Sequence, residues 1–141
     1  MNVPDNMKTN IYLRLMLILL SFVTVFHIGI IVKLIPYDIA WGGRLKNDQE
    51  MYVFETISIL INLLLISVLF IKAGFLKVKV NKKLINAVLW IFFFLFILNT
   101  VGNILAKTTF EKMFAVLTLI SAVFLWKILR IKDDEPLENR P

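Results

Sequence analysis

His27 and Glu55 are the two residues of this chain best suited to acid–base chemistry, and both lie inside hydrophobic segments. A titratable group in such a segment is costly in lipid, so it faces a partner or a cavity. An imidazole and a carboxylate held together could relay a proton or act as a general acid and base. His27 and Glu55 are therefore candidate catalytic residues. The alternative is a hydrogen bond that only holds two helices together.

Further polar residues share helix faces at these depths. Glu55, Ser58 and Asn62 follow one another at i, i+3 and i+7, and Asn99 and Asn103 are four residues apart, so each set lies on one face of its helix. We expect both sets to meet His27 in one polar pocket. Hydrogen bonds between helices are the alternative role of the three asparagines.

The segment after the first hydrophobic stretch is the most distinctive. Pro36 is expected to end the first helix, and Gly42-Gly43 permits backbone angles that are closed to other residues. Trp41 and Arg44 flank these glycines, a pairing suited to stacking on a ring and binding a carboxylate or phosphate. Alternatively, this is only a connecting loop, in which Arg44 pairs with Asp38, Asp48 or Glu55. The candidate ligand-binding residues are Asp38, Trp41, Arg44, Glu55, Ser58, Asn62, Asn99 and Asn103.

Four hydrophobic stretches must position these residues. A bilayer core about 30 Å thick needs roughly 20 apolar residues in a helix, which predicts membrane-spanning helices at about residues 11–35, 51–71, 84–106 and 112–131. The first stretch is too long for the core of a signal peptide and lacks a cleavage pattern, so we expect a retained helix. The fold class is an all-α membrane protein, an antiparallel four-helix bundle forming one domain over residues 1–141, with a flexible tail at 132–141.

Composition and charge narrow the possible functions. The chain is 59% hydrophobic and 18% charged, which is too apolar for a soluble domain of this size. It has no cysteine, which excludes disulfides, Cys-ligated zinc and iron–sulfur clusters, and no paired-histidine spacing predicts a metal site. We expect no metal and no cofactor. The net charge of +6 comes from residues between the hydrophobic stretches, where they set orientation rather than bind nucleic acid.

The distribution of Lys and Arg predicts the orientation. Eleven of the 16 lie on the side of the two termini and the second loop, and five lie on the opposite side. Such a bias places both termini in the cytoplasm. The terminal side holds Lys8, Arg14, Lys72, Lys77, Lys79, Lys82, Lys83, Lys127, Arg130, Lys132 and Arg140, and the other holds Lys33, Arg44, Lys46, Lys107 and Lys112.

The run Pro-Tyr-Asp-Ile-Ala-Trp-Gly-Gly-Arg-Leu at 36–45, followed by Glu50-Met51 and Phe54-Glu55, resembles the first-loop pattern of small uncharacterised four-helix membrane proteins of bacteria. The resemblance covers about a fifth of the chain and implies a bacterial inner-membrane protein. It implies no activity.

Three functions fit these observations. The first is a non-enzymatic membrane protein that binds a lipid, a small solute or a membrane partner through an outer-facing polar pocket. The second is a proton-coupled carrier or channel for a small solute, working as an oligomer because four short helices enclose little space. The third is a membrane enzyme acting on a lipid or isoprenoid. Expected partners are the bilayer and either another membrane protein or further copies of the chain.

Overall fold

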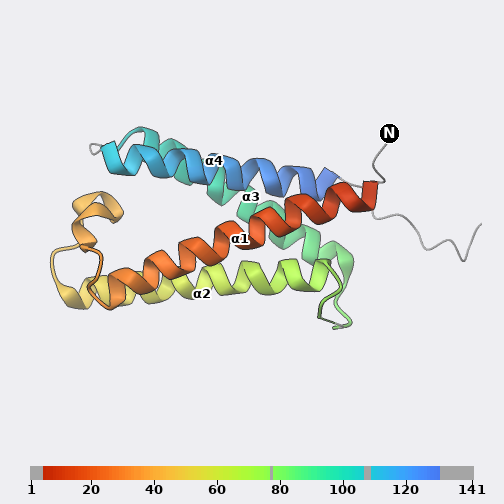
Figure 1. Cartoon of the computed structure of the whole chain (residues 1–141), viewed down its shortest axis with the longest axis horizontal. Helices are drawn as coiled ribbons and strands as arrows, with labels where there is room; N and C mark the ends of the chain where they lie inside the picture. Colours follow the sequence, from red (N-terminus) through yellow and green to blue (C-terminus); the bar gives the residue numbers. More distant parts are fainter. Residues whose placement is uncertain (1–4, 77, 107–108, 131–141) are drawn as a thin grey trace, which may run out of the picture.

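The computed structural model describes residues 5–76, 78–106 and 109–130, and in this part of the chain four long helices account for most residues. The elements are α1 (Asp5–Ile31), the 3-10 helices η1 (Tyr37–Ile39) and η2 (Trp41–Gly43), α2 (Asp48–Lys72), α3 (Lys82–Ile104) and α4 (Thr109–Arg130). Figure 1 shows the four long helices side by side, with η1 and η2 gathered at the end far from the N-terminus. We call this end the loop end, and residues 32–47 the α1–α2 loop.

All four expected helices are present, and their limits differ from the expected ones by a few residues. The helices begin earlier than expected because polar residues make up their first turns. Asn47 caps α2 by accepting a hydrogen bond from Glu50 N at 2.8 Å, as an N-cap residue does. Glu50 in turn accepts one from Lys46 N at 2.9 Å. The expected tail at 132–141 lies outside the described residues.

The first helix ends at Ile31, so the prediction that Pro36 ends it was wrong. The chain turns earlier because Lys33 adopts a left-handed conformation (φ 59°), and Leu34 N donates to Gly29 O at 2.9 Å. This is the hydrogen-bond pattern of a Schellman motif. Gly29 lies against Ile35 in this turn, and a Cβ there would lie 2.8 Å from Ile35 Cδ1, so a larger residue would require the Ile35 side chain to move. At the other end of α2, Gly74 follows the last turn with φ 78°, a left-handed conformation that glycine adopts readily.

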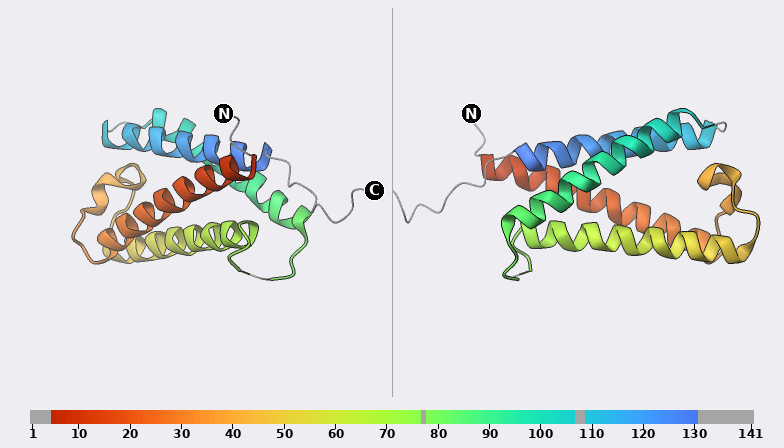
Figure 2. Two further views of the ribbon diagram at one scale, coloured as in Figure 1. Left: turned by 45° about the vertical axis from the view of Figure 1, so that its right-hand side comes forward. Right: turned by 180° about the vertical axis from the view of Figure 1, so that it is seen from behind.

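The core lies at the end of the bundle opposite the loop. There α1 packs on α2 and α4, and α3 packs on α4 and α2, and all four helices contribute apolar side chains to one cluster. Figure 2 shows α3 crossing α1 on the far side of the molecule from the view of Figure 1. The core residues are Leu13, Met16, Leu20, Leu65, Val68, Leu69, Ile85, Leu89, Phe92, Leu125 and Ile128.

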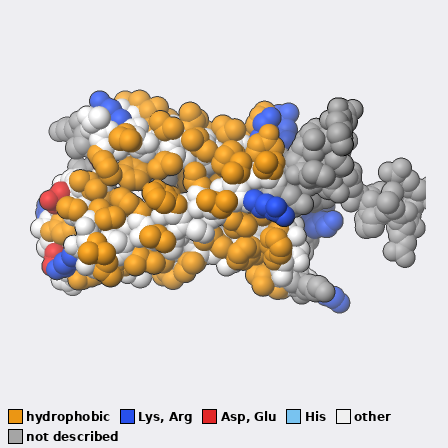
Figure 3. Space-filling view, in the orientation of Figure 1, with side chains coloured by type: hydrophobic (Ala, Val, Ile, Leu, Met, Phe, Trp, Pro, Cys, Tyr) orange, Lys and Arg blue, Asp and Glu red, His pale blue; other side chains and the backbone are white. Residues whose placement is uncertain are grey.

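The surface between the two ends is apolar. Figure 3 shows hydrophobic side chains over the middle of the molecule and charged ones gathered toward its ends. Large apolar residues stand exposed on every long helix, among them Ile18, Leu60, Leu98 and Val116. Each of the four helices is long and apolar enough to cross a membrane. Lipid would cover these side chains in the way that a core covers them in a soluble protein.

Candidate functional site

Glu55 is the centre of a polar cluster at the loop end of α1 and α2. Its side chain is completely buried, and both carboxyl oxygens have a partner. Oε2 lies 2.6 Å from His27 Nδ1 on α1, and Oε1 accepts a hydrogen bond from Trp41 Nε1 in η2 at 2.9 Å. A buried carboxylate is strongly destabilising unless it is hydrogen-bonded, so this arrangement depends on both partners. We call these three residues the Glu55 centre.

His27 supplies the contact from α1. It lies one turn before the end of α1, and its side chain is 19% exposed while Glu55 is fully enclosed. The contact between Nδ1 and Oε2 is a hydrogen bond, and the tautomer of the imidazole decides which of the two atoms donates. Because Nδ1 faces Glu55, the imidazole Nε2 is the atom left to exchange a proton or to meet another group. The sequence left open whether His27 meets Glu55, and the structure shows that it does, whereas their role in catalysis or binding stays a prediction.

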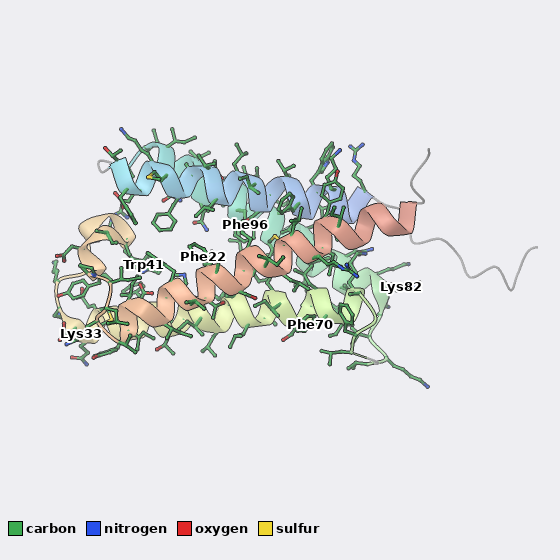
Figure 4. All side chains as sticks on the ribbon, in the orientation of Figure 1. Phe22, Lys33, Trp41, Phe70, Lys82 and Phe96 are labelled. Atoms are coloured by element: carbon green, nitrogen blue, oxygen red, sulfur yellow. The ribbon has the colours of Figure 1, made fainter. Side chains whose placement is uncertain are left out.

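Trp41 supplies the contact from the loop, and its backbone is strained. Its φ is 56°, a left-handed conformation that costs a non-glycine residue about 1 kcal/mol. The hydrogen bond from its indole to Glu55 and the packing of its ring on Phe54, with centroids 5.0 Å apart, offset that cost. Gly43 is also left-handed, with φ 63°, as Gly42-Gly43 led us to expect. Figure 4 shows Trp41 and Lys33 at the loop end and Lys82 at the other end.

The underside of the loop is apolar and holds it to the helices. A second cluster of buried residues joins α1, the loop and α2 and is separate from the main core. Tyr37 and Ala40 of the loop are therefore packed against buried residues. The buried members of this cluster are Ile30, Leu45 and Met51, with Phe26, Ile35, Tyr37 and Ala40 packed against them.

Two further polar bridges join α1 and the loop to α2. Asn62 Nδ2 donates to Thr24 Oγ1 at 3.2 Å, and the Thr24 hydroxyl donates to Leu20 O at 2.8 Å. Nearer the loop, Lys33 forms an ion pair with Asp48. The sequence analysis did not identify Thr24 as the partner of Asn62 or Lys33 as the partner of Asp48. Three polar bridges thus follow the α1–α2 contact from the loop toward the core.

Of the remaining candidate residues, none contacts the Glu55 centre through a hydrogen bond in the described part of the chain. Ser58 donates to Phe54 O on its own helix at 3.0 Å. Asp38 and Arg44 are exposed in the loop. Arg44 has no ion pair among the described residues, since Asp48 and Glu55, two of its expected partners, bind Lys33 and His27. Asn99 is exposed on α3 and Asn103 half-buried.

The sequence analysis missed a polar pair between α3 and α4. Thr100 Oγ1 donates to Thr118 Oγ1 at 2.8 Å. Threonine is common on apolar helices because its hydroxyl can bond to its own backbone, so nothing in the sequence singled out these two. Glu111 is also buried, in the first turn of α4. No cluster of three or more His, Cys, Asp or Glu residues able to hold a metal is present in the described ranges.

Comparisons of this chain with protein-family models, with curated proteins and with solved structures find no match. The resemblance of residues 36–55 to small bacterial membrane proteins therefore stays a prediction.

Proposed function

We propose that this chain is a bacterial inner-membrane protein that binds a ligand through its α1–α2 loop without catalysing a reaction. In this proposal the helices form an antiparallel bundle with both termini in the cytoplasm, so the loop end faces outward. The excess of Lys and Arg on the terminal side supports this orientation. The polar bridges support the antiparallel arrangement of the first two helices, because Lys33, His27 and Thr24 pair in turn with Asp48, Glu55 and Asn62.

The observation that carries the proposal is the hydrogen bond from Trp41 to the buried Glu55. It fixes the loop on the helix pair and so holds the rest of the loop in one conformation. Arg44 ends the same turn, with its N–H bonded to Trp41 O at 3.3 Å, and its guanidinium is exposed. A preorganised, exposed guanidinium binds an anionic group well because little flexibility is lost. An anionic lipid headgroup at the outer surface is the ligand this arrangement fits best.

Native mass spectrometry of protein released from nanodiscs tests this proposal. The nanodiscs contain phosphatidylcholine with or without phosphatidylglycerol. We expect the wild type to retain phosphatidylglycerol and Arg44→Gln to lose it. Lys46→Gln is the matched control, because Lys46 is an exposed cation of the same loop whose backbone N–H, not its side chain, contacts Glu50. Equal retention by all three proteins would show that the loop does not recognise the headgroup.

A proton-coupled carrier is the second candidate, favoured by the 2.6 Å contact between His27 and Glu55. A shared proton between a buried carboxyl and a partly exposed imidazole is what a proton relay needs. In vesicles carrying an internal pH dye, this function predicts proton entry that Glu55→Gln abolishes while the helical circular dichroism is unchanged. No difference from protein-free vesicles would exclude the second candidate and leave the first untouched.

A further inference from the structure

The outer surface of α3 carries the side-chain carboxamide of Asn99 at a depth where a membrane-spanning helix should have apolar side chains. Asn99 is exposed, and its side chain has no hydrogen bond to any described residue. It lies six residues from the middle of α3, or about 9 Å along the helix, and the hydrocarbon extends about 15 Å from its centre. Asn99 is therefore too deep for its short side chain to reach water or lipid ester groups. Asn103, one turn nearer the end of the helix, can reach them.

The exposed serines Ser21 and Ser67 do not have this problem. The hydroxyls of Ser21 and Ser67 each donate to the carbonyl four residues earlier, at 2.8 Å. A carboxamide has two donor hydrogens and an acceptor oxygen, which its own helix cannot satisfy. The amide of Asn99 thus needs a partner outside this copy of the chain.

Gly102 lies beside Asn99 on the same surface, one turn closer to the loop end. A Cβ on Gly102 would have no atom within 4 Å, so the packing of this chain does not require a glycine there. Small residues on membrane helices let a second backbone approach closely. Leu95 and Leu98 flank the pair and are 44% and 67% exposed, and Figure 2 shows no other helix in front of α3 when the molecule is viewed from behind.

We propose that this surface of α3, formed by Leu95, Leu98, Asn99 and Gly102, binds the same surface of a second copy of the chain. The carboxamide is self-complementary, so two Asn99 side chains related by a two-fold axis satisfy each other with two reciprocal hydrogen bonds. Residues 84–104 contain no charge, so two copies of this segment do not repel one another. The twofold axis passes near Asn99, where Gly102 allows the helices to cross in close contact. This inference does not depend on what the α1–α2 loop binds.

Disulfide formation between single cysteines tests the geometry directly, because the natural chain has no cysteine. Leu95→Cys keeps both Asn99 and Gly102 and lies near the proposed axis. We expect it to form covalent dimers in membranes on oxidation. Val101→Cys and Val116→Cys are matched controls, being 50% and 59% exposed on other surfaces of α3 and α4, and they should form few. Equal or greater cross-linking at either control position would overturn the proposal.

Energy transfer between labelled copies in phosphatidylcholine vesicles tests the contribution of each residue. We expect Asn99→Leu to raise the dimer dissociation constant about 10-fold, through loss of two interhelical hydrogen bonds, and Gly102→Leu to raise it at least as much. Val101→Leu should leave it unchanged. Wild-type protein that does not self-associate, or an Asn99→Leu variant that associates as well as wild type, would overturn the proposal. A different dimer surface would appear as association that neither variant weakens.

Discussion

Replacing Trp41 by phenylalanine should release the α1–α2 loop without unfolding the bundle. The change keeps an aromatic ring against Phe54 but removes the indole N–H that donates to Glu55 Oε1 at 2.9 Å. Glu55 is fully buried, and a buried group that loses its partner costs about 1–3 kcal/mol. At about 1.4 kcal/mol for each factor of ten, the open form of the loop should become about 5-fold to 150-fold more populated. The smaller increase applies if a water molecule enters and donates to Glu55 in place of the indole.

Hydrogen exchange of the loop amides in nanodiscs measures this opening. The reporting amides are those of Ala40, Gly43 and Arg44, which donate to backbone carbonyls within the loop, and they should exchange faster by the same factor. Trp90→Phe is the matched control, because Trp90 is a partly exposed indole on α3 that packs on Phe93 and Phe94. Unchanged loop exchange in Trp41→Phe, or an equal change in Trp90→Phe, would refute the idea that the indole hydrogen bond holds the loop.

Two further predictions concern the other polar bridges. Asn62→Leu removes the hydrogen bond to Thr24 and should lower the free energy of unfolding by about 0.6–1 kcal/mol, seen as a lower melting temperature in micelles. Ser67→Ala, which removes only a bond to its own helix, should not do so. The ion pair with Asp48 raises the pKa of Lys33 above 10.5, chiefly through the hydrogen bond and then through charge attraction. The pair therefore stabilises the fold at pH values below 10.5. This stabilisation is lost as the pH rises through the raised pKa of Lys33. As the pH rises through the raised pKa, the melting temperature of Lys33→Met should fall less than that of the wild type. An identical fall would show that the pair contributes nothing to stability.

The four helices could be predicted because hydrocarbon thickness sets a minimum length for an apolar segment. Their ends could not be placed as well, since a helix end depends on hydrogen bonds among a few residues. At Pro36 the general rule that proline stops a helix failed, because a Schellman turn through Lys33 had already ended α1. Lysine at a left-handed position is uncommon, so the residues around Lys33 did not predict this turn.

The contact between His27 and Glu55 could not be predicted from the sequence alone. Both are titratable residues in consecutive apolar segments, which made the contact possible, but whether they lie at the same depth depends on the loop at residues 32–47 that joins the two helices. Trp41 was expected to bind a ligand, and nothing in the sequence indicated that its indole would complete the hydrogen bonding of Glu55. That contact depends on how the loop folds back, which is determined by the packing of Leu45 and Met51 beneath it.

The contact between α1 and α2 has two parts, an apolar part near the core and a polar part near the loop, and they differ in their physical properties. Near the core, Leu13, Met16 and Leu69 pack without directional bonds. Lipid is as apolar as these side chains, so their association gains little from the hydrophobic effect in a membrane. Near the loop, hydrogen bonds join particular atoms, and breaking those of Glu55 leaves a buried polar group without a partner. The polar bridges therefore fix the register of the two helices, and through Glu55 they also fix the conformation of the loop.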